Sequence, residues 1–515
     1  IPNTIADLSS TAGSNSPAGS DPPTEGDNYL RAIQAILRQE HDNLSGTAGA
    51  TFVGFIQTGT GAVNRTALSK MREVVSVTDF GAVGDGTAND TTAVSAAISS
   101  GATAILFPPG TYKITASISL PNSDIRLYGF DNATIATPAA SSAFKRVHRG
   151  KLFVMDGLSF SGAGIAFRYD GTTIGDGPFP FGTQYFEYRI SNCRFLQTSA
   201  TYALHFDGSR EGLLSNCYFE NNKGAYYSKT VNSDVLGCHF KNCVSNIYHD
   251  TGSEGLKIIG GTSLGATIGL YATTVAGIQL DGLMWDYNDQ PVLMYGCDNV
   301  SITNCYMSCR LEFGSIYIGK TGGGRHTTQV TIANNQIASN YNNSAANAIH
   351  LEFCDYVFIT GNSIFNWQNN GVDHTDCTFL QISDNYIAPK SGTGNYAISA
   401  YPTDSTSNRY YSNTLLKTIN QGSTPTRDMW GNTTFVSENS GEVTFTSGTG
   451  AGGVTITHGL SAAPLKGQVK LTPTSTIVTA TKWWISAVSS TTITVTFDAN
   501  LGANASFSWS AQLRP

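Results

Sequence analysis

The sequence has few charged residues, and the negative ones outnumber the positive ones. Asp, Glu, Lys and Arg make up 13% of 515 residues, against about 25% in an average globular protein, and the formal net charge is −7. A surface that binds nucleic acid needs a basic stripe to contact phosphates, so we expect no nucleic-acid partner. No stretch approaches the roughly 18 apolar residues of a membrane span, and the N-terminal segment lacks a secretory-signal pattern, so neither is expected.

The cysteines lack the paired spacing of a metal site. There are nine, all between Cys193 and Cys377, and the nearest approach to zinc-ligand spacing, Cys305 with Cys309, has no second pair to complete four ligands. We therefore expect reduced, buried thiols that behave as small apolar side chains. Synthesis in a reducing cytosol follows, and we expect neither a metal nor another cofactor.

Glycine and aromatic residues are what the sequence has in quantity. It contains 54 Gly, 25 Phe and 23 Tyr. This profile favours short stacked strands joined by tight turns over a helical protein. Because the chain is longer than one ordinary core supports, we expect several domains or a solenoid that grows by repetition.

The N-terminal region predicts a helix after a flexible leader. Residues 1–23 are rich in Ser, Gly, Pro and Ala, and residues 24–27 resemble a helix-capping box. Apolar residues then recur at helical spacing: Leu30, Ile33, Ile36, Leu37 and Leu44. A helix of about four turns with one apolar face needs a partner, either elsewhere in its own chain or in copies from other subunits.

The most specific motif lies between residues 77 and 112. It reads Val77-Thr78-Asp79-Phe80-Gly81-Ala82-Val83-Gly84-Asp85-Gly86-Thr87, then Asn89-Asp90-Thr91-Thr92, a short helical stretch, and Phe107-Pro108-Pro109-Gly110-Thr111-Tyr112. This segment resembles the opening of pectate-lyase-like proteins, the family that includes phage tailspikes, polysaccharide lyases and polygalacturonases. The resemblance implies a right-handed parallel β-helix. A capping helix near residues 89–100 would cover its first coil, with Asp79, Asp85 and Asp90 as turn and cap residues.

Residues 150–400 repeat a short pattern. An aliphatic residue, a polar residue, Asn or Gly and a small residue recur at 190–193, 214–217, 302–305, 332–335, 359–362 and 382–385, with weaker copies between them. A period of roughly 22 residues with strand-like alternation predicts coils of a parallel β-helix, with like residues stacked about 4.8 Å apart. The Leu spacing of leucine-rich repeats is missing. Four cysteines, at 193, 217, 238 and 305, would form one inward ladder.

The predicted fold is therefore all-β and has three parts. Residues 1–72 are the leader and helix, for virion attachment or a trimer stem, and residues 73–425 are the β-helix. Residues 426–515, with short alternating segments rich in Thr, Val and Ser, predict a C-terminal β-sandwich for trimerisation or carbohydrate binding. This last part resembles the sandwich that ends many phage tail proteins.

Alignment of a second strand in each coil predicts an outward strip of rings and carboxylates. One column runs through His205, Tyr227, Tyr248, Tyr271, Leu293, Tyr317, His350 and Asp373, and beside it run Asp207, Lys229, Asp250, Thr273, Tyr295, Gly319, Glu352 and Thr375. Sugar rings stack on aromatic faces and sugar hydroxyls bond to carboxylates, so we interpret the strip as a glycan site, with Trp285, Trp367 and Arg325 as further binding residues. Burial against a neighbouring subunit and simple solvation are the alternatives.

Pairs of carboxyl groups are the candidates for catalysis. Glycoside hydrolysis usually needs one carboxyl group as acid and another as base or nucleophile. Glu352 and Asp373 lie diagonally on adjacent coils, at an expected separation of about 5 to 9 Å, beside the longest intervals between repeats. Asp207 with Asp250, and Asp286 with Asp289, are the alternative pairs.

The resemblance implies a tailspike on the phage virion that acts at the host cell surface. It would be a homotrimer attached to the phage tail or baseplate through its N-terminus, and it would hydrolyse a capsular polysaccharide or lipopolysaccharide O-antigen. One alternative is a lyase that eliminates across a uronic acid with help from Arg310 or Arg325, although no Asp cluster has calcium spacing. Another alternative is a non-catalytic adhesin.

Overall fold

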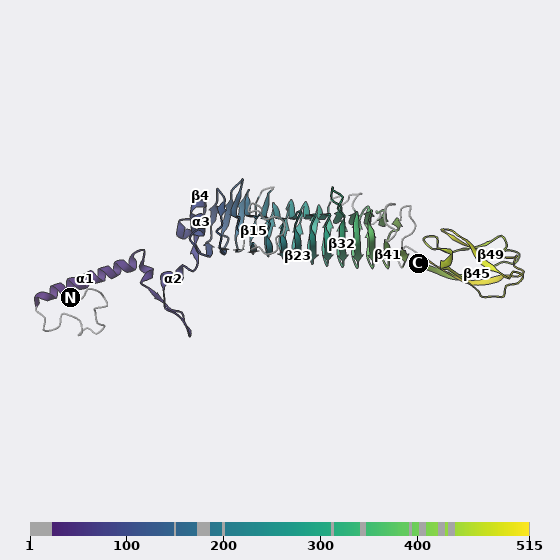
Figure 1. The fold of residues 1–515 in the computed structure, drawn as a ribbon, viewed down its shortest axis with the longest axis horizontal. Coiled ribbons are helices and arrows are strands. Elements are labelled where there is room, and N and C mark those ends of the chain that lie inside the picture. The colour runs from purple at the N-terminus through teal and green to yellow at the C-terminus, as the bar shows by residue number, and fades with distance from the viewer. Residues whose placement is uncertain are drawn as a thin grey trace.

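The computed structural model describes residues 23–148, 151–171, 186–197, 201–310, 314–339, 347–390, 394–400, 408–420, 428–430 and 438–513. A helix, a solenoid of parallel strands and two small antiparallel sheets follow one another along the long axis of the molecule (Figure 1). Within these ranges, no helix combines the length and apolar character needed to cross a membrane.

The N-terminal helix α1 spans Pro23–Ser45 and is longer than the four turns predicted. The polar residues on both sides of the apolar stretch continue the helix, which apolar spacing alone does not reveal. Ile36 is buried, whereas Leu30, Leu37 and Leu44 are 61%, 56% and 55% exposed. A hairpin of β1 (Gly54–Phe55) and β2 (Arg65–Thr66) and the short helix α2 (Ala67–Met71) lead to the solenoid.

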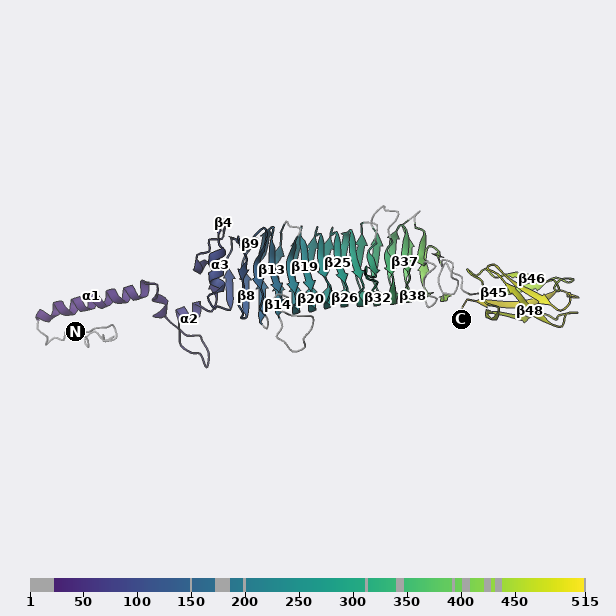
Figure 2. The ribbon, with the colours of Figure 1, turned by 45° about the horizontal axis from the view of Figure 1, so that its top comes forward.

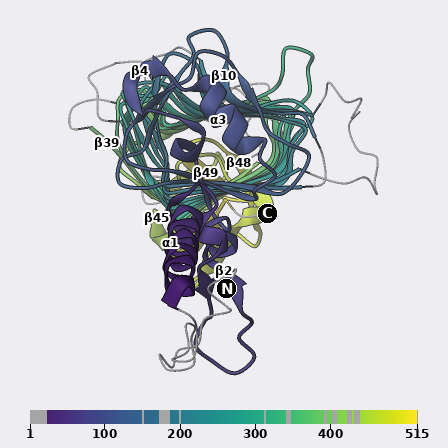
Figure 3. The same cartoon turned by 90° about the vertical axis from the view of Figure 1, so that its left-hand side faces the viewer.

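The helix α3 (Thr91–Ile98) covers the first coil, as the resemblance implied. Figure 3 shows it across the end of the solenoid, and Val94, Ala97 and Ile98 are buried in the solenoid core. The carboxylates of Asp79, Asp85 and Asp90 accept hydrogen bonds from nearby backbone N–H groups. These three aspartates therefore hold turns.

The solenoid is a right-handed parallel β-helix of three sheets, which confirms the predicted fold. Among the described residues, sheet 1 has 15 strands from β3 (Val75–Ser76) to β44 (Asp428–Trp430), and sheet 2 has 14 strands from β4 (Asp85–Asn89) to β42 (Thr414–Leu415). In the same ranges, sheet 3 has 13 strands from β7 (Ile118–Ser119) to β43 (Ile419–Asn420). Each coil contributes one strand to each sheet, so equivalent residues of successive coils stack.

Sheet 3 positions the site. Figure 2 shows its strands β13, β19, β25 and β37 along one flank of the solenoid. Its strands between the two ends are β10 (Ser142–Arg146), β13 (Ile165–Asp170), β16 (Tyr202–Asp207), β19 (Lys223–Ser228), β22 (Ser245–His249), β25 (Ile268–Thr273), β28 (Gln290–Tyr295), β31 (Ile316–Gly319), β34 (Ile349–Glu352), β37 (Asn370–Thr375) and β40 (Tyr396–Ala400).

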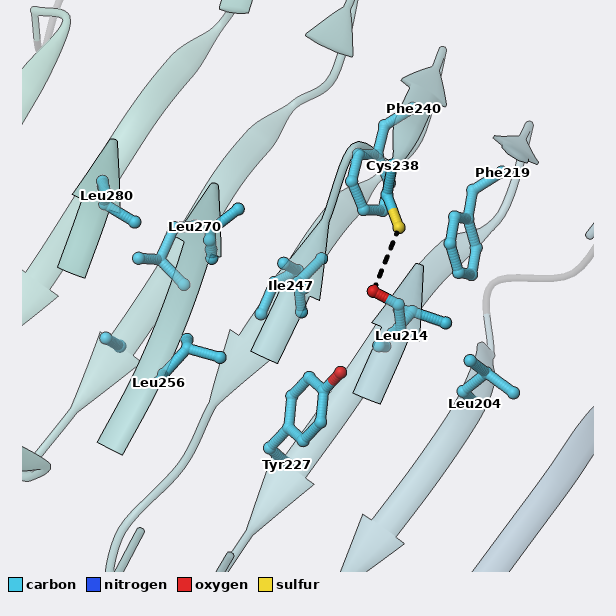
Figure 4. Close-up of a cluster of buried hydrophobic side chains, with 14 of the residues drawn as sticks. Leu204, Leu214, Phe219, Tyr227, Cys238, Phe240, Ile247, Leu256, Leu270 and Leu280 are labelled. Atoms are coloured by element: carbon cyan, nitrogen blue, oxygen red, sulfur yellow. Dashed lines mark hydrogen bonds between the residues drawn. The ribbon is translucent and has the colours of Figure 1, made fainter. Parts of the chain in front are cut away.

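The repeat found in the sequence marks the turn between sheets 1 and 2. Its Asn or Gly has a positive φ, for example 54° at Asn192 and 67° at Gly361, a backbone conformation that these two residues tolerate best. The next residue points inward. All nine cysteines are buried and free, and Cys193, Cys217, Cys238 and Cys305 occupy this inward position, as predicted. Figure 4 shows Cys238 among the core side chains.

Further along, asparagines replace the cysteines at the same inward position. Asn335, Asn362, Asn385 and Asn413 are buried. Each of the first three donates from Nδ2 to Oδ1 of the next, at distances of 3.0, 2.9 and 3.0 Å. Because each amide is paired within the stack, the core can hold these polar groups.

The C-terminal part is the predicted β-sandwich, two three-stranded antiparallel sheets on a small core. One sheet is β45 (Glu438–Phe445), β50 (Ala505–Gln512) and β47 (Val469–Pro473), and the other is β46 (Val454–Thr457), β49 (Thr492–Phe497) and β48 (Trp483–Val488). Phe445, Phe497 and Phe507 pack together between them, with ring centroids 5.6 to 5.8 Å apart.

Candidate functional site

An outward column of side chains runs along sheet 3. Strand pairing places these residues in register: Lys145, Arg168, His205, Tyr226, Tyr248, Tyr271, Leu293, Tyr317, His350, Asp373 and Ser399. We call this column, together with Asp250, Tyr295 and Glu352 beside it, the sheet 3 strip.

Aromatic rings touch along much of the strip. Ring centroids are 5.2 Å apart for Tyr226 and Tyr248, 4.7 Å for Tyr248 and Tyr271, and 6.0 Å for Tyr271 and Tyr295. The series continues through Tyr295 and Tyr317 at 5.5 Å and ends with Tyr317 and His350 at 5.0 Å. These side chains are half-buried, so each keeps part of a ring in contact with solvent.

Tyr227 does not belong to the strip, so its predicted outward placement was wrong. It pairs with Phe206 and stacks on that ring at a centroid distance of 5.3 Å, inside the solenoid (Figure 4). Tyr226 takes the outward position. Consecutive tyrosines carry no polarity signal to fix the register of β19, and a shift by one residue exchanges the two faces of a strand. The same shift puts Ser228, not Lys229, beside Asp207 and Asp250.

Trp285 and Trp367, predicted to bind sugar, are buried in the core. They lie on β27 (Met284–Asn288) and β36 (Ser363–Trp367) of sheet 2, at 1% and 0% exposure. Each ring packs against a glycine across the interior. A Cβ on Gly269 would come within 2.7 Å of the Trp285 ring, and one on Gly371 within 3.2 Å of the Trp367 ring. The glycines make room for the rings, so the prediction for both tryptophans was wrong.

Glu352, His350 and Asp373 meet in one hydrogen-bonded network. His350 lies 3.0 Å from Glu352 through Nε2 and 2.9 Å from Asp373 through Nδ1. Tyr317 donates from its hydroxyl to Glu352 at 2.8 Å. The structure therefore brings the predicted acids together, but with the imidazole of His350 between them.

Asparagines hold the far side of this network. Asn347 donates to Asp373 Oδ2 at 3.4 Å, and Asn370 donates to Asp373 Oδ1 at 3.1 Å. The backbone N–H of Asn370 donates in turn to the side chain of Asn347. Sequence reasoning missed both asparagines, although each stands three residues before its column residue, His350 or Asp373, and that repeated spacing was a usable signal.

The network shifts the pKa values of His350, Glu352 and Tyr317. Burial disfavours the charged imidazole of His350, but its hydrogen bonds to Asp373 and Glu352 outweigh this effect, and the pKa of His350 is raised. Burial also disfavours the charged form of Glu352, but hydrogen bonds from His350 and Tyr317 outweigh it, and the pKa of Glu352 is lowered. Burial, together with the carboxylate of Glu352, raises the pKa of Tyr317.

The two acids differ in access to solvent. The Glu352 side chain is 37% exposed, whereas that of Asp373 is 4% exposed, so the outward exposure predicted for Asp373 was wrong. The hydrogen bonds from His350, Asn347 and Asn370 occupy its carboxylate and hold it in the wall of the solenoid. Glu352 is accessible to a ligand, whereas Asp373 is enclosed and contacts His350.

The other predicted acids lie in different surroundings. Asp250 is on the strip and accepts a hydrogen bond from Tyr226 at 2.5 Å, and Asp207 is two coils away, in register with Asp170. Asp286 lies on β27 of sheet 2, and Asp289 lies in the turn between β27 and β28 of sheet 3. Asp289 is buried and forms an ion pair with Arg310.

The arginines predicted to assist an elimination are both in ion pairs. Arg310 is paired with Asp289, and Arg325 with Asp298 at the start of β29 (Asp298–Thr303) in sheet 1. Arg325 follows β31 of sheet 3 in the chain and its side chain is 44% exposed, so its contact with sugar stays a prediction. No group of three or more His, Cys, Asp or Glu side chains is arranged to hold a metal ion in the described part of the chain.

Comparison with known proteins agrees with this architecture. Residues 74–307 match the family model for rhamnogalacturonase A/epimerase, pectate lyase-like. That match and the three stacked sheets place the matched segment in the pectate-lyase-like class of right-handed β-helices. No curated protein sequence matches the chain.

Solved structures share the fold at low sequence identity. Tailspike protein 3 of bacteriophage CBA120 is 13% identical, with a TM-score of 0.55 over 78% of this chain and 67% of that one. The surface adhesin PfbA of Streptococcus pneumoniae is 16% identical, with a TM-score of 0.50 over 64% and 99% of the two chains. A variant tailspike of E. coli bacteriophage HK620, in complex with a pentasaccharide, is 14% identical, with a TM-score of 0.49 over 92% and 100%.

Proposed function

We propose that the protein is a phage tailspike that binds a bacterial capsular polysaccharide or O-antigen along the sheet 3 strip and hydrolyses it at Glu352. The observation that supports this most is the continuous series of ring contacts from Tyr226 to His350, which ends at a half-exposed, ionised carboxylate. An extended glycan can stack on the rings and reach the carboxylate with one glycosidic bond. The likeness to the tailspike of bacteriophage CBA120 agrees with this role.

The chemistry we propose uses the paired acids through the imidazole between them. Glu352, kept ionised, is the base that activates water or the nucleophile that attacks the sugar. His350 carries the proton that both carboxylates stabilise, and it is the group able to deliver that proton to the leaving oxygen. Asp373 is a positioning residue that holds His350 charged and oriented.

We propose further that three copies assemble and attach to the phage tail or baseplate through the N-terminal part, so that the protein acts from the virion at the host surface. The exposed leucines Leu30, Leu37 and Leu44 support this, because a seven-residue spacing of apolar side chains is typical of helices that pack in coiled coils. In this proposal the N-terminal helix packs against its copies in the other subunits.

A non-catalytic adhesin is the second candidate. The likeness to the pneumococcal adhesin PfbA and the burial of Asp373, which leaves only one acid of the pair exposed, favour it. A lyase is less favoured, because Arg310 and Arg325 are committed to Asp289 and Asp298.

An assay of the protein on purified host capsule or O-antigen distinguishes these functions. For a hydrolase we expect the release of reducing ends without the absorbance of an unsaturated sugar, and the loss of that release in Glu352→Gln. Binding of the polysaccharide without reducing-end release would establish an adhesin, and an unsaturated product would establish a lyase.

A further inference from the structure

A pocket lies at the N-terminal end of the sheet 3 strip, far from Glu352. It has a volume of about 270 Å³. Lys145 of β10 and Arg168 of β13 line it, and its walls come from the chain segments 139–142 and 163–165. Lys145 and Arg168 are paired in register on adjacent coils, so their side chains leave sheet 3 next to each other.

The walls of the pocket are made of small residues that approach closely. Ala139, Ala140 and Ala163 line it beside Gly164. A Cβ on Gly164 would lie 1.8 Å from the carbonyl oxygen of Pro138, so a larger residue would force the two wall segments apart. The close approach of these two segments therefore fixes one wall of the recess, and Lys145 and Arg168 contribute to its lining.

The two cations are only partly neutralised by their carboxylate. Asp170 Oδ2 lies 3.6 Å from Lys145 Nζ and 3.3 Å from Arg168 Nη2, longer than ordinary charge-assisted hydrogen bonds. Arg168 Nε is buried and has no acceptor among the described residues. No carboxylate is among the described residues that line the pocket. Two positive groups thus share one carboxylate, beside a recess with room for a further anion.

We propose that this pocket binds an anionic substituent of the glycan, either the carboxylate of an acidic sugar or a phosphate group. The inference rests on the proposed function in one respect, that the anion belongs to the glycan on the strip. A bidentate guanidinium beside an ammonium suits both anions.

The position of the pocket defines what it contributes. Seven steps of strand pairing separate Arg168 from His350, or roughly 34 Å at about 4.8 Å per coil. The pocket therefore acts on selection and register of the polymer, while the chemistry takes place at Glu352. A polysaccharide with an anionic group in its repeating unit is the substrate class that fits both the pocket and the site at Glu352.

Saturation-transfer NMR on the full-length protein tests the pocket with small probes. We expect saturation transfer from the protein to D-glucuronate, and we expect inorganic phosphate to displace the glucuronate. Methyl glucoside lacks the negative charge and should show no saturation transfer. Lys145→Gln and Arg168→Gln should each weaken glucuronate binding by at least about tenfold, since each removes a charge-assisted contact. Lys257→Gln is the matched control, because Lys257 is an exposed cation on sheet 1.

The outcomes separate this proposal from the proposed function. Glu352→Gln should bind glucuronate as tightly as the wild type does, even if this variant no longer depolymerises the polysaccharide. Broadening of the phosphorus NMR signal of inorganic phosphate without saturation transfer to glucuronate would support the pocket and assign it to a phosphorylated substituent. The proposal is overturned if the wild type gives neither saturation transfer to glucuronate nor broadening of the phosphate signal, or if both pocket variants bind as the wild type and Lys257→Gln do.

Discussion

At the scale of single residues, His350 joins two acids of unequal exposure. A raised pKa means that the charged imidazole stabilises the folded state at low pH, and that this contribution is lost as pH rises through the folded pKa of His350. A lowered pKa means that ionised Glu352 stabilises the folded state at high pH, and that this contribution is lost as pH falls through the folded pKa of Glu352. The complete network is therefore present between these two values.

The two acids should both be needed for turnover, for different reasons. We expect Glu352→Gln and Asp373→Asn each to lower kcat by at least about a hundredfold, the usual scale for loss of an acid or base. Glu352→Gln removes the group that meets the sugar, and Asp373→Asn removes the partner that keeps His350 charged. Gln336→Asn, on an exposed position of sheet 2, is a control. If both variants keep wild-type turnover on purified polysaccharide, cleavage occurs elsewhere, and Asp207 with Asp250 would be the next pair to replace.

The pH profile distinguishes the positioning role from a structural one. For the wild type we expect kcat/KM to fall below the pKa of Glu352 and above the raised pKa of His350. In Asp373→Asn the alkaline limb should move to lower pH, because His350 loses the carboxylate that contributes most to raising its pKa. The residual rate of the variant, measured across pH with the same polysaccharide, checks this. An unchanged alkaline limb would mean that His350 is not the group that titrates there.

Single residues also show where sequence reasoning ends. The strip was found because Tyr248, Tyr271 and Tyr317 alternate with aliphatic neighbours. Tyr226 and Tyr227 defeat this criterion because both are tyrosine, and only the pairing with Phe206 decides which one faces inward. Burial of Asp373 was not predictable either, because it depends on Asn347 and Asn370, which approach it from the starts of two neighbouring coils.

At the scale of the element, each coil contributes one residue to an inward ladder just after the turn between sheets 1 and 2. Sulfur fills this position in four coils, at Cys193, Cys217, Cys238 and Cys305, and amide groups fill it in later coils. In the amide part, Asn362 donates to Ile332 O at 2.8 Å and to Asn385 at 2.9 Å, and accepts from the backbone of Asn335 at 2.9 Å. One side chain thus satisfies groups of three coils.

Replacement of Asn362 should therefore weaken several coils at once. Asn362→Leu keeps a similar volume but leaves buried donors and acceptors of the neighbouring coils without partners, each at a cost of about 1 to 3 kcal/mol. We expect a clear drop in Tm at a fixed scan rate. Gln336→Leu, at an exposed position of the adjoining strand, should change the unfolding free energy by no more than about 0.5 kcal/mol. Equal Tm values for the two variants would contradict the ladder's role.

The sulfur part of the ladder makes a chemical prediction. Burial raises the pKa of the Cys305 thiol to about 11, and burial together with neighbouring thiols holds the pKa of Cys217 and Cys238 well above their usual range. Protonated, enclosed thiols do not attack disulfides. We expect no reaction of the native protein with an aromatic disulfide reagent, and nine equivalents after denaturation. Fast labelling of the native protein would show that the solenoid opens.

The coil was the element best predicted from the sequence. The Asn or Gly at positive φ, the small inward residue and the alternation around them follow from local chemistry, so period and ladder were readable without a structure. The packing of side chains inside the solenoid could not be predicted from the sequence. Trp285 and Trp367 were taken for surface rings, because their partners Gly269 and Gly371 lie on sheet 3 while the rings lie on sheet 2, and no local pattern links them.

At the scale of the whole molecule, three unlike parts follow one axis (Figure 1), and the first of them exposes its apolar side chains. If α1 packs against its copies, Leu30, Leu37 and Leu44 lie at the centre of a helical bundle. Light scattering should then give the mass of three chains of 54.7 kDa each. Leu37→Glu should weaken this association, whereas Gln39→Glu, at an exposed position of the same helix, should not. A wild-type protein that is monomeric at micromolar concentration would contradict the proposed trimer.

The last prediction separates attachment from catalysis. Deletion of residues 1–72 removes α1 and α2 but keeps the whole β-helix, including α3, whose Val94, Ala97 and Ile98 cover the first coil. The end of the solenoid therefore stays protected, and the sheet 3 strip lies entirely within the remaining chain. We expect the shortened protein to release reducing ends from polysaccharide at the rate of the full chain, and to fail to join phage particles that lack their own spike. Loss of cleavage by a shortened protein that remains trimeric and folded would mean that the N-terminal part contributes to the site itself.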